Sequence, residues 1–361
     1  MMNKQELVGK VQTVLGLIDP DDLGITLPHE HLLSDISCWF DEPSEATEKG
    51  LAHQPVSFEN ISWVRYHRMN NLDNLKMCDE KLTIEEVKRF RISGGNAIVE
   101  LTPNNVGRDP AGMARISRAT GLHVIMGTAY YVESSYRPEM HMDSRSADNI
   151  AEEFVNDIIS GNGDTGICAG IIGEIGCSWP LTENEKKVLR AAALAQQDTG
   201  APISIHPSLY EDGPMDIVKI LTDAGADLSR TVMGHTGRTL SARNIPSKFT
   251  ELADTGCYIE YDMFGLETYY PPTLGGTQIV SFGPNDVIRI KEITELISQG
   301  YLKQILISHD IWYKAALTCF GGWGYDHILR DVVPAMKSWG VSDEQIHTII
   351  VDNPKHLLTF V

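Results

Sequence analysis

Eight short apolar runs recur along this chain of 361 residues, separated by stretches with helical periodicity. Strands that alternate with helices predict a parallel sheet, because a helical crossover returns the chain to the end of the sheet where the next strand begins. Eight such units are the number that closes a (β/α)8 barrel, or TIM barrel. The expected strands are Gly24–Leu33, Ala97–Thr102, His123–Gly127, Gly170–Glu174, Pro202–His206, Thr231–His235, Cys257–Tyr261 and Gln304–Asp310.

Helix start and stop signals lie between these runs. Thr83–Glu86, Thr182–Glu185 and Ser342–Gln345 fit the capping box, in which the first and fourth side chains satisfy exposed backbone N–H groups at a helix start. Gly94-Gly95 and Gly200 lie where helices are expected to end before the next strand.

One domain over residues 1–361 is the simplest organisation, because there is no Pro/Ser-rich linker and no repeat beyond the strand–helix alternation. Two connections are long: residues 38–82 after the first strand and residues 264–286 after the seventh. Loops that follow barrel strands lie on the face where active sites are built. We therefore expect both loops to form lids or walls that select the substrate.

The acidic composition restricts the classes of partner. The formal net charge of −19 argues against nucleic acid and against an anionic membrane surface, and an anionic substrate would need a locally placed arginine. No apolar run is long enough for a membrane span or a signal-peptide core. The six cysteines form no CxxC pair, which favours reduced thiols and a cytoplasmic protein. A small-molecule substrate is the expected partner, and a homodimer stays open.

His29 and His31 stand two residues apart in the first expected strand. Residues two apart in a strand point to the same side, so both imidazoles would face the barrel axis, where they could share a metal ion. An isolated pair of this kind also occurs in packed cores. Metal binding by this pair is better supported because four further side chains that can bind a metal end other expected strands, namely Glu174, His206, His235 and Asp310.

Carboxylates at the mouths of apolar strands need a counter-charge, because an unpaired buried charge is costly. A pair of divalent metal ions supplies about +4, which two carboxylates and a bridging hydroxide nearly balance, while four neutral imidazoles complete the coordination. The sequence therefore predicts a binuclear metal site held by His29, His31, Glu174, His206, His235 and Asp310.

Five segments resemble the phosphotriesterase family of the amidohydrolase superfamily. They are Val11–Gly16 with Leu23–His31 at the start, Gly321–Leu329 with Asp352–Lys355 at the end, and Gly170–Glu183 in the middle, the last being similar to the phosphotriesterase-related protein subgroup. The resemblance covers nearly the whole chain. It implies that His29, His31 and Asp310 bind the more buried metal and that His206 and His235 bind the more exposed one.

Glu174 stands where the founding phosphotriesterases have a carboxylated lysine that bridges the metals, as it does in the related-protein subgroup. Either side chain offers two carboxylate oxygens. The departure puts phosphotriester activity in doubt, because the loops and the pocket differ along with the bridge.

A metal-bridging hydroxide that attacks a carbonyl, with Asp310 as the catalytic group that accepts its proton, is the expected mechanism. The resemblance implies small N-acyl amides of the N-acetyltaurine type as substrates. A lactonase acting on lactones, including sugar lactones, is the alternative, and a non-catalytic ligand-binding relative is a third. Zinc is the default metal, with manganese, iron or cobalt also compatible with these ligands.

Several other polar residues near strand ends are candidate substrate contacts. Glu100 either hydrogen-bonds the substrate or pairs with an arginine, and Arg238 either holds an anionic group or forms a surface salt bridge. Tyr130 and Tyr131, like Tyr261 and Asp262, either line the pocket or serve packing, and His309 is expected to point away from the metals because it precedes Asp310.

Overall fold

A computed structural model describes residues 4–240, 246–267, 273–274, 277–278 and 284–361. Its centre is one eight-stranded sheet in which all neighbouring strands run parallel. The first and last strands approach each other, since the backbone N–H of Asp310 donates to the carbonyl of His29 at 3.2 Å. The predicted barrel is confirmed, and its strands in order are β3 (Thr26–Glu30), β6 (Ala97–Glu100), β7 (His123–Thr128), β8 (Ile171–Gly176), β9 (Ile203–His206), β10 (Thr231–Met233), β11 (Tyr258–Tyr261) and β14 (Ile305–Ile307).

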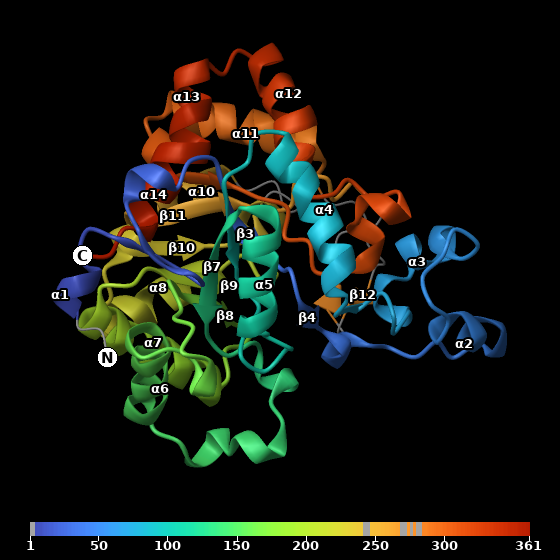
Figure 1. Ribbon diagram of the computed structural model, residues 1–361, viewed down its shortest axis with the longest axis horizontal. Helices are drawn as coiled ribbons and strands as arrows, with labels where there is room; N and C mark the ends of the chain where they lie inside the picture. Colours follow the sequence, from blue (N-terminus) through green and yellow to red (C-terminus); the bar gives the residue numbers. More distant parts are fainter. Residues whose placement is uncertain (1–3, 241–245, 268–272, 275–276, 279–283) are drawn as a thin grey trace.

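Helices follow each of these strands and surround the sheet (Figure 1). The chain therefore alternates strand and helix as the apolar pattern predicts, and the carboxyl ends of all the strands meet at one face. The surrounding helices are α4 (Glu80–Ile92), α5 (Pro110–Thr120), α6 (Ala147–Ile159), α7 (Glu183–Thr199), α8 (Gly213–Asp223), α10 (Pro246–Ala253), α11 (Asp286–Ser298), and then α12 (Val333–Ser338), α13 (Asp343–His347) and α14 (Asn353–Leu358).

Capping signals fix two of the three helix starts that they predict. The boxes at Thr182 and Ser342 are both formed, and Gly200 caps α7 with a left-handed φ of 77°. The box at Thr83 is wrong, because α4 begins at Glu80 and Thr83 lies inside the helix. Asp79 caps it instead, its carboxylate accepting from the backbone N–H groups of Lys81 and Leu82.

Strand alternation divides the core in two. Val99, Leu101 and Ile125 pack together in one cluster with residues from the chain ends, whereas Ile98 and Val124 pack in the large cluster that includes the surrounding helices. A short hairpin, β1 (Val11–Thr13) with β2 (Gly16–Ile18), adds Val11 to the first cluster, and the short helix α1 (Lys4–Leu7) precedes it. The barrel interior is thus filled and closed at the end opposite the strand carboxyl ends.

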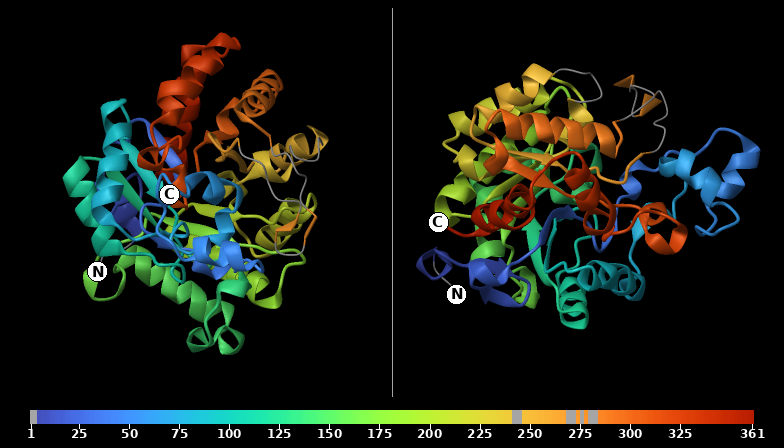
Figure 2. Two further views of the ribbon diagram at one scale, coloured as in Figure 1. Left: turned by 90° about the vertical axis from the view of Figure 1, so that its right-hand side faces the viewer. Right: turned by 90° about the horizontal axis from the view of Figure 1, so that it is seen from above.

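The connection after β3 forms a small projection beside the barrel. It holds α2 (Ala46–Ala52) and α3 (Ile61–Tyr66), which stand out on the right in Figure 1 and in the right panel of Figure 2. An antiparallel pair, β4 (Ser34–Asp35) with β5 (Lys76–Met77), joins its two ends. The predicted long loop is therefore an ordered element next to the strand carboxyl ends.

The connection after β11 is described only in part. Two short strands, β12 (Thr273–Leu274) and β13 (Thr277–Gln278), pair antiparallel. Residues 268–272, 275–276 and 279–283 of this predicted long connection lie outside the described residues. Among the described residues no helix has the length and apolar character to cross a membrane, and all six cysteines are unpaired.

Candidate metal centre

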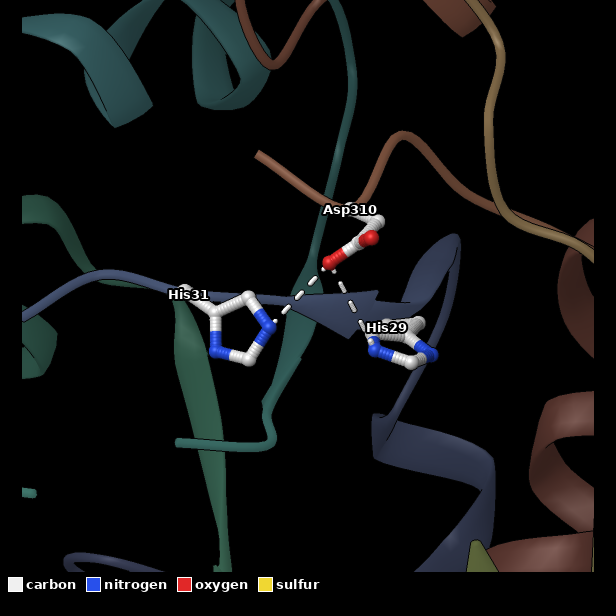
Figure 3. Close-up of side chains that lie close together, drawn as sticks. All are labelled: His29, His31 and Asp310. Carbon is white, nitrogen blue, oxygen red and sulfur yellow. Dashed lines mark ion pairs between the residues drawn. The ribbon is translucent and has the colours of Figure 1, made fainter. Parts of the chain in front are cut away.

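The six predicted metal ligands converge at the carboxyl ends of five strands. His29 lies on β3 and His31 directly after it, and Figure 3 shows both rings pointing to the carboxylate of Asp310. His31 Nε2 lies 3.1 Å and His29 Nε2 lies 3.7 Å from Asp310 Oδ1. The same-side placement predicted from strand alternation is confirmed for this pair.

Glu174 lies at the centre of the cluster. Its Oε2 is 3.3 Å from His29 Nε2 and 3.1 Å from His206 Nδ1, and its Oε1 is 3.5 Å from His31 Nε2. His235 Nε2 approaches the same Oε2 at 3.5 Å. One carboxylate thus touches all four imidazoles, which is the placement that a group shared between two metal ions requires.

Two of these residues lie in turns rather than at the ends of strands. Sequence alternation places His235 and Asp310 last in their strands, but β10 ends at Met233 and β14 ends at Ile307. Both residues have a φ of 52°, in the left-handed region that side chains other than glycine seldom adopt. The predicted strand ends are therefore wrong. The tight turns direct both side chains inward, so that His235 Nε2 lies 2.7 Å from His206 Nδ1.

The cluster has the electrostatics of a cation site. Burial acts to lower the pKa of His29, but the facing carboxylates of Asp262 and Glu174 outweigh burial and raise that pKa well above its ordinary value. Burial likewise acts to raise the pKa of Glu174, and the surrounding histidines, led by His206, hold it well below the usual range. These carboxylates therefore stabilise positive charge in their midst.

The donor set also fits divalent metal ions. His29 Nε2 is fully buried and has no hydrogen-bond partner among the described residues, although it faces Glu174 and Asp310. Burial lowers the pKa of His206 to about 4, which keeps its imidazole neutral and able to coordinate. Groupings of ligand atoms that could hold an ion include His29, His31 and Asp310 together, and His29 with Glu174 and His235.

Two carboxylates lie behind the histidines: Glu260 was missed in the sequence, and Asp262 was considered only for lining the pocket or for packing. Glu260 Oε2 and Asp262 Oδ2 each lie 3.1 Å from His29 Nδ1, and Asp262 Oδ1 lies 3.0 Å from His235 Nδ1. Such contacts orient metal-binding imidazoles and raise their basicity. The available signal was the spacing of two between Glu260 and Asp262, the same spacing that identified His29 and His31.

His309 points away from the metal ligands, as expected. Its Nδ1 lies 2.7 Å from Glu30 Oε1, and its Nε2 accepts the backbone N–H of Ile328 at 3.1 Å. Glu30 also accepts the backbone N–H groups of His309 and Ile311 at 3.0 Å each. These contacts hold the segment that carries Asp310.

A pocket of about 270 Å³ opens directly above the cluster. His31, Glu174, His206 and Asp310 form part of its lining, so the centre is accessible to a small molecule. The remaining lining comes from loops after the strands, and the projection after β3 contributes Trp39 and Met69. The long connection 38–82 therefore supplies part of the wall, as predicted.

Arg238 and Tyr131 are the pocket-lining members of the predicted substrate contacts among the described residues. Glu100 is not in the lining: it is fully buried, and its carboxylate accepts from Thr102 Oγ1 at 2.6 Å and from the backbone N–H of Leu32 at 3.0 Å. It shares the strand face of Ile98, which packs toward the helices. No ion pair between Glu100 and an arginine is seen among the described residues, and Glu100 lies outside the pocket lining that a substrate would contact.

Tyr130 and Tyr261 also lie away from the pocket. The Tyr130 hydroxyl donates to Glu153 at 2.8 Å and accepts from Arg145 at 2.8 Å. The Tyr261 ring is fully buried and stacks on Phe249 with the ring centroids 5.7 Å apart. Both tyrosines take the packing role that was the alternative in the sequence.

Comparison with known proteins agrees with this geometry. A sequence profile of the phosphotriesterase family matches residues 9–358. The chain is 40% identical to an N-acetyltaurine hydrolase of Dictyostelium discoideum and 42% identical to a phosphotriesterase-related protein of Nematostella vectensis. The alignments cover 99% of both chains for the first relative, and 98% of this chain and 99% of the other for the second. The resemblance predicted from the sequence is confirmed.

Solved structures share the fold. A resiniferatoxin-binding protein from Rhodobacter sphaeroides superposes with a TM-score of 0.91 and is 36% identical, covering 99% of this chain and 98% of that one. A phosphotriesterase-like lactonase mutant from Deinococcus radiodurans gives a TM-score of 0.74 at 28% identity, with coverage of 96% and 99%.

We expect Glu174→Gln to disrupt the binuclear centre, because an amide offers one neutral oxygen where Glu174 presents an anion to four imidazoles. Metal analysis of the purified variant should give clearly fewer than two ions per chain. Glu183→Gln, on the exposed start of α7, is the matched control and should keep the metal content of the unmodified protein. Two tightly bound ions in Glu174→Gln would contradict the assignment.

Proposed function

The chain belongs to the phosphotriesterase family of metal-dependent hydrolases, and we propose that it hydrolyses small N-acyl amides of the N-acetyltaurine type. The observation that carries the proposal is the cluster of His29, His31, Glu174, His206, His235 and Asp310 at the base of a pocket whose wall holds Arg238. Full-length identity of 40% to an N-acetyltaurine hydrolase supports the choice of substrate.

Two divalent ions would be held by this cluster. His29, His31 and Asp310 would bind one ion, His206 and His235 the other, and Glu174 both. Imidazole and carboxylate ligands suit zinc, which we propose as the native metal over manganese, iron or cobalt. Metals of this kind, when bound, lower the pKa of water and polarise a substrate carbonyl.

We assign the proton transfer to Asp310. Its carboxylate lies at the floor of the pocket, 6% exposed, with Oδ1 against His31 and Oδ2 3.8 Å from His235 Nδ1. A carboxylate there can accept a proton from the attacking water and deliver it to the leaving amine. The backbone contacts around Glu30 keep Asp310 in this position.

Arg238 is proposed to bind the anionic group of the amine half. Its Nη2 donates to the carbonyl of Pro207 at 3.3 Å, and its buried Nε has no partner among the described residues. No carboxylate of the described chain forms an ion pair with its guanidinium, so the salt bridge considered as its alternative role is not seen there. In a protein of net charge −19, such a cation gives an anionic substrate its local attraction.

Three further properties of the enzyme are its number of domains, its compartment and its oligomeric state. We propose that residues 1–361 form one hydrolase domain, because the barrel and its helices span the described sequence from end to end. The cytoplasm is the proposed compartment, since all six cysteines are unpaired. The homodimer stays a prediction.

A lactonase is the second candidate. The structural similarity to a phosphotriesterase-like lactonase favours it, and a lactone carbonyl could occupy the same place as an amide carbonyl. Turnover of the metal-loaded protein on N-acetyltaurine, other N-acetyl amino acids and a lactone panel separates the candidates. The proposal requires the highest kcat/KM on an anionic amide, and a preference for lactones would replace it. Bound metal without turnover on any substrate would point to a non-catalytic binding protein.

Asp310→Asn should lower kcat by roughly a hundredfold or more while the fold is kept, the scale typical of lost acid–base assistance. The amide is nearly the same size as the carboxylate but cannot take up the proton. Asp164→Asn, on an exposed turn, is the control and should leave kcat unchanged. Near-normal kcat in Asp310→Asn would assign proton transfer to another residue.

Arg238→Ala should lower kcat/KM for N-acetyltaurine more than tenfold, because a charged hydrogen bond contributes about 1.5–3 kcal/mol. Turnover of the neutral N-acetylethanolamine should change little, and Arg238→Lys should recover part of the loss. Equal losses on the two substrates would show that Arg238 only supports the loop after β10.

A further inference from the structure

The pocket has an apolar wall on one side. Trp39 and Met69 come from the projection after β3, Val132 follows β7, and Trp312 follows β14. All four pack on one small hydrophobic cluster that also contains Ile36 and Tyr131. These six residues are called the apolar wall below.

The polar side chains of the lining lie on other loops, which also contribute apolar surface at Trp179, Leu209 and Tyr210. Ser178 follows β8, Ser208 follows β9, and Arg238 follows β10. In the closed sheet the strand order places β10 across the barrel from β6 and well away from β3. A substrate anchored at Arg238 would therefore extend its other end toward the apolar wall.

The apolar wall begins beside the metal ligands. The Tyr131 hydroxyl lies 3.3 Å from His206 Nε2, and the Tyr131 ring meets Trp39 edge to face with the centroids 6.3 Å apart. The acyl group of an amide whose carbonyl lies at the metal centre thus meets aromatic and aliphatic surface immediately.

An acetyl group leaves most of this surface exposed. A methyl group contacts one or two side chains, whereas the wall consists of six residues around a cavity of about 270 Å³. Pockets lined in this way bind ligands that bury their apolar parts against the lining. The size and chemistry of the wall match an acyl group of several carbons.

We propose that this enzyme prefers amides whose acyl group is an apolar chain or ring larger than acetyl, held against the apolar wall while the anionic amine half binds Arg238. This inference rests on the proposed amide hydrolysis and deepens it by naming the substrate class.

A homologous series of N-acyltaurines with acetyl, butanoyl and hexanoyl groups tests the preference on the metal-loaded enzyme. Each methylene buried on the wall should raise kcat/KM roughly fourfold, so butanoyl should exceed acetyl by at least tenfold. Equal or falling values along the series, with N-acetyltaurine well hydrolysed, would overturn this inference and leave the proposed function intact. No turnover on any member would reject both.

Substitutions in the apolar wall test whether this surface binds the acyl group. Trp39→Ala should lower the hexanoyl-to-acetyl ratio of kcat/KM at least fivefold, because it removes the largest apolar surface from one end of the wall. Met69→Ser provides the same test if Trp39→Ala does not fold. Trp339→Ala, at an exposed tryptophan after α12, is the matched control and should keep the ratio. An unchanged ratio in folded Trp39→Ala and Met69→Ser would assign the acyl group to another part of the pocket.

Discussion

The contact of one carboxylate with four imidazoles is the interaction on which the site depends. Glu174 lies within 3.5 Å of His29, His31, His206 and His235, and all but His206 are almost completely buried. Burying so many ionisable groups is costly unless their charges balance, and Asp310 and Asp262 add further negative charge. Divalent cations held at the centre, as proposed, would balance these charges. The facing carboxylates raise the pKa of His29 well above its ordinary value, and the surrounding histidines hold the pKa of Glu174 well below its usual range.

The barrel brings these groups together because its parallel strands end at one face. His29, Glu174 and His206 lie on strands β3, β8 and β9, with the pairing register shifting around His29 and Glu174, while tight left-handed turns carry His235 and Asp310. Behind the ligands, Glu260 and Asp262 fix the imidazole rings and Glu30 fixes the segment of Asp310. The loops beyond the strands then form a pocket with Arg238 on one side and apolar surface on another. The barrel strands and the turns that follow them thus carry the predicted metal ligands, and the loops carry the residues that would select the substrate.

Apolar runs and their flanking signals sufficed to predict the eight strands, and alternation along β3 predicted that His29 and His31 share one side. The left-handed turns at His235 and Asp310 were not predicted, because the strands end before these two residues. The same alternation could have excluded Glu100, which shares a strand face with the helix-packed Ile98. Glu260 escaped notice because it lies inside a strand, where only the neighbouring strands bring it to His29. The sequence could not distinguish Tyr130, which lies away from the pocket, from Arg238, which lines it. Whether a loop side chain faces the pocket depends on packing against residues far away in the sequence.

The two-metal site can be tested by anomalous X-ray diffraction from crystals grown with zinc, because this measurement locates each ion without reference to activity. A binuclear site predicts two strong peaks about 3.5–4 Å apart, the usual separation in two-metal sites, with Glu174 between them. One peak should adjoin His29, His31 and Asp310, and the other His206 and His235. A single peak, or peaks away from these side chains, would contradict it.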